Sequence, residues 1–304
     1  MTTFGRRRTA FALSVALIVL AGANDAWAAK TTTTAKARAK TATTATTAVR
    51  IASTTKVAVT ASADTLNGMK QAKWGSNVTV TYADGVLRYV SNGIPNHARQ
   101  SQYALPNTGV RVPSAATAHA GADPTAAQTY DYKIPTTPTK ASKPTSASLG
   151  VIGVMISGAA LFNPYEGDNA TVATASNFTV KDANGNDVAF LDSCNGHPTP
   201  RGQYHYHGLP TCVTSTVDTA TGPSHIIGVA FDGYPIYGDR DSSGKKITSS
   251  QLDACNGITS ATPEFPEGIY HYVLLNTPDA TSSIKCFTGT VDSSLTSKQG
   301  MPGM

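Results

Sequence analysis

Three histidines lie close together in one stretch of the chain, and their spacing is suited to binding a metal ion. His205 and His207 alternate with tyrosines in the run Tyr204–His207, and His197 lies eight residues before His205. In an extended strand, side chains two positions apart point to the same face, about 7 Å apart along the chain. Neutral imidazole is a good ligand for zinc, copper, iron and nickel. The stretch therefore predicts a transition-metal site, for copper or zinc, on one face of a strand.

Further candidate ligands lie downstream of this stretch. Together the candidate metal ligands are His197, His205, His207, His225 and His271. Asp192 and Asp232 are candidate oxygen ligands or hydrogen-bond partners of the histidines. Asp232 precedes a glycine, so it fits a turn-capping role equally well. A strand histidine is more often a hydrogen-bonded structural residue than a ligand, so a metal-free hydrogen-bond network is the alternative interpretation.

Several segments of the chain share the pattern of one known family. They are the run Cys194–Cys212, with its Tyr-His-Tyr-His sequence, and the segments Asp232–Gly238, Ser91–His97 and Gly158–Pro164. These segments resemble the YHYH domain family of secreted bacterial and eukaryotic proteins. The family is named for its motif rather than for an established reaction, so the resemblance implies no particular activity. The resemblance also makes His97, at the end of Ser91–His97, a candidate site residue.

The histidine-rich stretch is repeated later in the chain. Leu191–Gly196 is repeated as Leu252–Gly257, and Gly202–Tyr206 is repeated as Gly268–Tyr272. The second copy keeps His271 but has Ile258 and Val273 at or near the positions of His197 and His207. This difference predicts a single metal site in the first copy, with His271 either contributing to it or serving the structure.

Each copy also has two cysteines, and four cysteines allow three pairings. If the two copies are structurally equivalent, Cys194 pairs with Cys212 and Cys255 pairs with Cys286. One disulfide that joins the two copies is the alternative. Metal binding by the cysteines is a third possibility, and the lack of any Cys-x-x-Cys sequence argues against it.

The first 65 residues have the composition of an export signal and a spacer. Arg6–Arg8 precede the apolar run Ala10–Ala23, and Ala26–Ala28 supplies small residues for cleavage, so residues 1–28 are predicted to be a signal peptide. A retained membrane anchor is the alternative, although the apolar run is short for a span. Residues 29–65 are almost entirely Thr, Ala and Lys and are predicted to be a disordered spacer. The protein is therefore expected to be exported, to the periplasm or the extracellular space.

The net charge of +5 comes from these first residues. From residue 66 on, 15 basic residues face 17 acidic ones, so the folded part has a net charge of −2. A nucleic-acid-binding face needs a basic stripe on a folded surface, so nucleic acid is not an expected partner. The basic spacer could contact anionic envelope polymers. Nothing in the composition predicts an oligomeric state.

Residues 66–292 are predicted to form one mainly β domain, a sandwich or distorted barrel with long loops, an internal repeat and two disulfides. A hairpin is expected over Asn77–Val90, and Leu149–Ile156 and Ile226–Phe231 read as buried strands whose glycines mark bulges or close backbone approach. Residues 104–148 read as a long surface excursion that includes Tyr130–Ile134. Short helices are expected at Thr171–Ser176 and at Thr248–Cys255, and residues 293–304 are predicted to be a flexible tail.

Three functions fit these features. The preferred one is a secreted domain that binds a metal ion without turnover. The second is a metal-dependent enzyme, an oxidase or hydrolase, in which the ion keeps an open coordination position. The third is a structural or carbohydrate-contacting envelope module whose histidines only close a hydrogen-bond network. Neither Gly-x-Ser-x-Gly nor His-Glu-x-x-His occurs in the sequence, which weakens the case for a common hydrolase.

Overall fold

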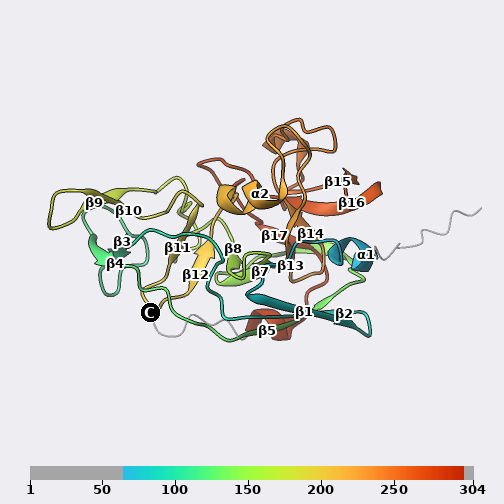
Figure 1. Ribbon diagram of the computed structural model, residues 1–304, viewed down its shortest axis with the longest axis horizontal. Coiled ribbons are helices and arrows are strands. Elements are labelled where there is room, and N and C mark those ends of the chain that lie inside the picture. Colours follow the sequence, from blue (N-terminus) through green and yellow to red (C-terminus); the bar gives the residue numbers. More distant parts are fainter. Residues whose placement is uncertain (1–63, 298–304) are drawn as a thin grey trace, which may run out of the picture. The chain divides into compact units, whose positions relative to one another are not determined.

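The computed structural model describes residues 64–297 (Figure 1). The predicted signal peptide, 1–28, and the predicted spacer up to residue 63 lie outside the described residues. Thr65, at the end of that predicted spacer, is buried and its hydroxyl donates to the carbonyl oxygen of Thr136, so the fold begins slightly earlier than expected. Within the described residues, no helix has the length and apolar character that a membrane span requires.

An eight-stranded sheet carries the histidine-rich stretch. Its strands are β7 (Val151–Met155), β8 (Ala160–Phe162), β11 (Gly196–Pro198), β12 (Tyr204–Tyr206), β13 (Ile226–Ala230), β14 (Pro235–Tyr237), β15 (Gly257–Thr262) and β16 (Phe265–Val273). They lie in the order β11-β12-β8-β7-β13-β14-β16-β15. Only the β8–β12 and β14–β16 pairs are parallel. Counted outward from the central β7–β13 pair, the strands therefore follow β7-β8-β12-β11 on one side and β13-β14-β16-β15 on the other.

The two halves of this sheet are copies of one four-stranded unit. Val154 pairs with Val229 at the centre, and the two hairpins have the same register, with Val154 opposite Ala160 in one and Val229 opposite Pro235 in the other. The outer pairs also match, because His205 faces His197 as His271 faces Ile258. The predicted repeat is confirmed and is longer than the sequence analysis found, since it includes β7–β8 and β13–β14.

Glycines allow the two central strands to lie close together, as predicted. A Cβ on Gly153 would lie 2.8 Å from the carbonyl oxygen of Val229, and one on Gly228 would lie 2.5 Å from that of Val154. The register of each hairpin also shifts beside its glycine. Both expected features, a bulge and close backbone approach, are present at these equivalent positions.

A three-stranded sheet packs on the middle of the eight-stranded sheet. It consists of β1 (Val78–Ala83), β2 (Val86–Ser91) and β5 (Tyr130–Pro135), so the predicted hairpin is confirmed. Tyr89 donates a hydrogen bond to the carbonyl oxygen of Met155, and the rings of Tyr132 and Phe231 lie 4.9 Å apart. The core therefore sits between the β7–β13 pair and this second layer. The sheets of the described residues do not close into a barrel.

The long excursion predicted for 104–148 is wrong in part, because strands account for much of it. Besides β5, the region holds most of β3 (Gln102–Pro106) and all of β4 (Ala118–Ala122) and β6 (Lys140–Ser146); β3 pairs with β4, and β6 pairs with β17 (Cys286–Gly289). A further small pair is β9 (Thr179–Lys181) with β10 (Asp187–Ala189). Strands β4 and β6 pair through backbone hydrogen bonds and bury no side chains. Their sequences therefore show no clear hydrophobic pattern.

The helices of the described residues are few and mostly lie elsewhere than predicted. They are α1 (Leu66–Met69), α2 (Thr211–Val217), the 3₁₀ helix η1 (Ser249–Gln251) and α3 (Ser293–Ser297). Of the helix expected at Thr248–Cys255 only η1 forms, and the N–H of Thr248 before it donates to Gln251 Oε1 at 2.9 Å. Thr171–Ser176 forms turns rather than a helix. The predicted flexible tail is helical over α3, where Leu295 is buried, and residues 298–304 lie outside the described residues.

Candidate metal site

The imidazoles of His197, His205 and His207 converge on one point at the edge of the eight-stranded sheet. One nitrogen of each ring lies within 4.8 Å of the other two. Because β11 and β12 are antiparallel and place His197 opposite His205, these two rings lie on the same face. His207 follows β12 by one residue, and its Nε2 lies 3.0 Å from Nε2 of His205. All three side chains are buried.

The outer nitrogens of two rings are held by backbone carbonyls. Nδ1 of His205 lies 3.1 Å from the carbonyl oxygen of Gln203, and Nδ1 of His207 lies 2.8 Å from that of Asn163. A carbonyl oxygen can only accept, so both Nδ1 atoms carry the proton and donate it. In a neutral ring this leaves a lone pair on Nε2. Two lone pairs therefore face each other across 3.0 Å.

The third ring has a nitrogen that no protein group satisfies. His197 Nε2 is buried and has no hydrogen-bond partner within the described part of the chain. A buried polar atom without a partner is costly and usually marks a missing ion, water or ligand. Three nitrogens thus gather at one point, and no hydrogen-bond donor of the described residues meets the lone pairs of His205 and His207.

Burial keeps these rings neutral. It lowers the pKa of His207 to about 4 and lowers the pKa of His197 and His205 well below the ordinary imidazole value, with a smaller contribution from the neighbouring histidines to the last two. Protonation would otherwise relieve the lone-pair contact between His205 and His207. Because burial opposes protonation, the lone-pair contact between His205 and His207 persists at neutral pH.

Aromatic rings hold the cluster in place beside a cavity. Phe162 stacks on His205 with the ring centres 3.8 Å apart, and Phe190 lies 4.3 Å from His197. All three histidines line a cavity of about 1030 Å³, whose wall also includes Glu166. Burial raises the pKa of Glu166 to about 8. The cluster is therefore rigid on the protein side and has free space on the other side.

The tyrosines of the motif face the other way and support the strand. Tyr204 donates to a carboxylate oxygen of Asp192 at 2.7 Å, and the Tyr206 hydroxyl lies 2.6 Å from Nε2 of His97. The other carboxylate oxygen of Asp192 accepts from the backbone N–H of Cys194, inside the turn that leads into β11. Asp192 therefore orients the turn and the strand, and its oxygens are already occupied.

The remaining candidates lie away from the cluster. His225 Nδ1 bonds to Glu264 at 2.8 Å, and His271 Nδ1 bonds to the carbonyl oxygen of Ile269 at 3.0 Å. His271 lies on β16, five strands from β12 in the sheet order, a separation of about 24 Å at the usual strand spacing. Asp232 accepts from Tyr272 and from the backbone N–H of Gly289. The structure thus brings together three of the five predicted ligands and leaves the other two in the second copy.

Sequence reasoning missed the groups that make the cluster rigid. The ring of Phe162, the last residue of β8, and the carbonyl oxygen of Asn163, which follows it, are far from the histidines in sequence. A signal was present, because Val151–Phe162 and Ile226–Tyr237 share the pattern of two apolar residues, Gly and Val, followed by a Gly-containing turn. Recognising it would have shown that β7–β8 and β13–β14 are equivalent hairpins of the repeat. Glu166 has no comparable signal.

The comparisons with known proteins agree with the motif. The family model described as YHYH protein matches residues 131–250 and 244–289. Together these ranges cover more than half of the chain and include every strand of the eight-stranded sheet. The chain therefore belongs to the YHYH protein family. Comparisons with curated proteins and with solved structures returned no match.

Proposed function

We propose that this protein binds a transition-metal ion, zinc or copper, through His197, His205 and His207. The observation that carries the proposal is the lone-pair contact between His205 and His207 beside the unsatisfied Nε2 of His197. Three imidazoles without a thiolate or carboxylate suit zinc, copper, iron or nickel. An exported location is part of the proposal, and the two disulfides support it because such bonds persist outside reducing compartments.

The spacing of the nitrogens fits such an ion. Two imidazole nitrogens at about 2.0–2.1 Å from a tetrahedral zinc ion are about 3.4 Å apart. His205 Nε2 and His207 Nε2 are 3.0 Å apart, so this pair needs to separate by only a few tenths of an ångström, and the His197 nitrogen lies within 4.8 Å of both. The carbonyl partners at Nδ1 of both rings are the kind of outer contact that orients histidine ligands in metal sites.

Metal content of the purified protein tests the proposal. Protein prepared without a histidine tag and loaded with zinc or copper is expected to retain one ion per chain after gel filtration. The His205→Ala, His207→Ala double variant is expected to lose it, because removing two ligands costs more than the 10–100-fold typical of losing an outer contact. Inductively coupled plasma mass spectrometry gives the stoichiometry.

The second copy of the repeat provides the control. His271→Ala removes the residue equivalent to His205 and is expected to leave metal content unchanged. Folded wild-type protein that carries no ion after loading with either metal would refute the proposal and leave the metal-free structural module. Metal lost equally in His271→Ala would place the site elsewhere.

A metal-dependent enzyme is a second candidate, and the cavity favours it. Three protein ligands leave a coordination position open, which is typical of catalytic zinc sites and rare in structural ones. Such an ion, when bound, polarises water or a substrate oxygen. Glu166 lines the same cavity and, with its pKa raised to about 8, holds a proton at neutral pH that it can give to a neighbouring atom.

Azide binding separates the two candidates. A cobalt-loaded sample is expected to change its visible absorption on addition of azide if a coordination position faces the cavity. An unchanged spectrum at saturating azide would mean that the position is closed, which leaves a binding protein without turnover. Glu166→Gln keeps the shape of the cavity wall and should leave azide binding intact, because Glu166 is not a ligand in this proposal.

A further inference from the structure

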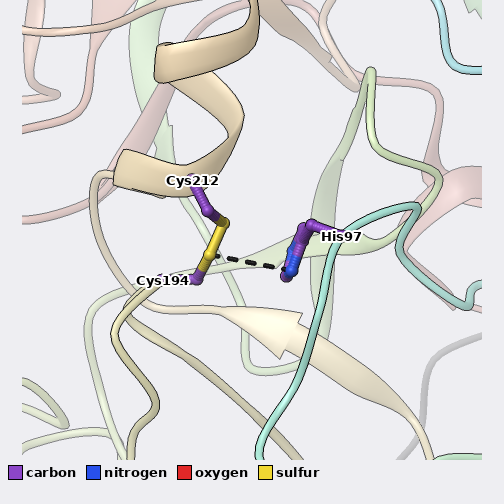
Figure 2. Close-up of side chains that lie close together, drawn as sticks. All are labelled: His97, Cys194 and Cys212. Atoms are coloured by element: carbon purple, nitrogen blue, oxygen red, sulfur yellow. Dashed lines mark hydrogen bonds between the residues drawn. A yellow bond between two sulfur atoms is a disulfide. The ribbon is translucent and has the colours of Figure 1, made fainter.

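The disulfide of the first copy has a histidine beside it, and the disulfide of the second copy does not. Figure 2 shows His97, from the loop after β2, next to the bond between Cys194 and Cys212. Nδ1 of His97 lies 3.7 Å from Sγ of Cys194. Within residues 64–297, no histidine nitrogen lies within 4.8 Å of both sulfurs of the Cys255–Cys286 bond.

The hydrogen bonds of His97 place its proton on the side of the sulfur. Nδ1 lies 2.8 Å from the carbonyl oxygen of Ala98, which can only accept, and Nε2 lies 2.6 Å from the Tyr206 hydroxyl, which can donate. These two contacts together assign the proton to Nδ1, with Tyr206 donating to Nε2. The N–H of His97 therefore faces both Ala98 and Cys194.

The two sulfurs of this bond differ in access. Cys194 is only 2% exposed, whereas Cys212, in the first turn of α2, is partly exposed. An incoming thiolate therefore reaches Cys212, and Cys194 becomes the leaving sulfur. The rate of such an exchange increases as the leaving thiolate is stabilised. A hydrogen bond from a nearby N–H is one means of stabilising it.

We propose that Cys194–Cys212 is a redox-active disulfide that exchanges with an external dithiol, and that His97 promotes the exchange by donating its N–H to the departing Cys194 thiolate. Cys255–Cys286 serves as the purely structural counterpart. The inference does not depend on metal binding, because His97 and both sulfurs lie outside the three-histidine cluster.

The exchange balances in two steps. A thiolate of the dithiol attacks Sγ of Cys212, a sulfur–sulfur bond forms between them, and the electron pair of the broken bond goes to Cys194. The second thiol of the reagent then attacks the reagent's own sulfur in the mixed disulfide and releases Cys212. Two electrons and two protons pass from the dithiol to the two cysteines, and the reagent leaves as a disulfide.

The second disulfide provides an internal reference. Cys255 is 1% exposed and Cys286 is partly exposed, so the two bonds resemble each other in access. Each also joins the same turn of its copy to a later element, α2 in one case and β17 in the other. The two bonds differ in that His97 lies beside Cys194–Cys212.

Timed reduction tests the proposal in the full-length protein. Samples in dithiothreitol with a chelator are quenched with iodoacetamide, and mass spectrometry follows the alkylation of each cysteine. Cys194 and Cys212 are expected to be alkylated roughly tenfold faster than the other pair, because the N–H of His97 stabilises the departing Cys194 thiolate and a better-stabilised thiolate leaves faster. His97→Ala should remove the difference, and His97→Gln, which keeps an N–H donor, should retain part of it.

His119→Ala is the matched control. His119 is exposed and bonds only to Asn107 among the described contacts, so both rates should stay unchanged. Equal rates for the two disulfides in the wild type would refute the proposal, as would a His97→Ala protein that keeps the wild-type ratio. If His97→Ala loosens the whole fold, both cysteine pairs will be alkylated faster. The ratio of the two alkylation rates in His97→Gln then decides, because the proposal requires Cys194 and Cys212 to stay faster than the other pair in that variant.

Discussion

Acidification from pH 7 to pH 4 is expected to cost the metal-free protein roughly 3 kcal/mol of stability through His207 alone. Burial lowers the pKa of this ring from 6.5 to about 4. Between these two values the unfolded chain binds a proton at this position and the folded chain does not. The unfolding free energy therefore falls as the pH falls, and the contribution of His207 is fully present only above pH 6.5. His197 and His205 act in the same direction.

Comparing the pH dependence of stability in the wild type and in a variant without the His207 ring isolates the contribution of His207. Burial raises the pKa of Asp232 to about 6 and that of Glu166 to about 8, and such raised carboxyl groups act in the opposite direction. Their contribution cancels when the wild type is compared with His207→Val, which introduces the residue that the second copy has at this position. Urea unfolding with a chelator at pH 4, 5, 6 and 7 gives the two curves. Parallel curves would contradict the expected coupling, and His119→Val should give parallel curves.

Removal of the Cys255–Cys286 bond is expected to lower the unfolding free energy by about 4 kcal/mol. The bond closes a loop with a sequence separation of 31, and the chain-entropy account relates the loss to loop length. The Cys255→Ala, Cys286→Ala double variant should show this loss in urea unfolding, with a lower midpoint and little native structure lost in the absence of denaturant.

The other disulfide is the natural comparison. Cys194–Cys212 has a sequence separation of 18, so its removal should cost about 3 kcal/mol. A change below about 1 kcal/mol in either double variant would show that the bond does not restrict the unfolded chain as the chain-entropy account requires. The comparison also separates stability from reactivity, because similar losses of stability could accompany very different rates of reduction.

Much of the fold was predictable because the chain repeats its own strongest pattern. The repeated Asp-x-Cys-Asn-Gly turn indicated equivalent halves, and equivalence led to both disulfide pairs, which the structure confirms. The turn has the same hydrogen bonds in both copies, with Asp192 accepting from Cys194 and Asp253 accepting from Cys255. The central strands were also predictable from their uninterrupted apolar runs.

Other parts could not be read from the sequence. Strands β4 and β6 consist mostly of small or polar residues, none of them buried, so neither alternation nor an apolar run marks them. Helix α2 is short, and its sequence is rich in Thr and Val, which are weak helix formers. The outer contacts of the histidines were also hidden, because the parallel β8–β12 pair, rather than the spacing of the motif, brings the carbonyl group of Asn163 to His207.

The second copy of the repeat has the same backbone arrangement as the first but different buried side chains. Where the first has imidazoles, Ile258 and Val273 pack with Ile247 and Leu275. The turns, strand register and tyrosine–aspartate contacts are nevertheless the same. An ion at the first copy would thus be added to an already finished frame, unlike the ion of a zinc finger, on which folding itself depends. Under the proposed function, the protein would therefore fold without an ion and bind one later, wherever its surroundings supply it.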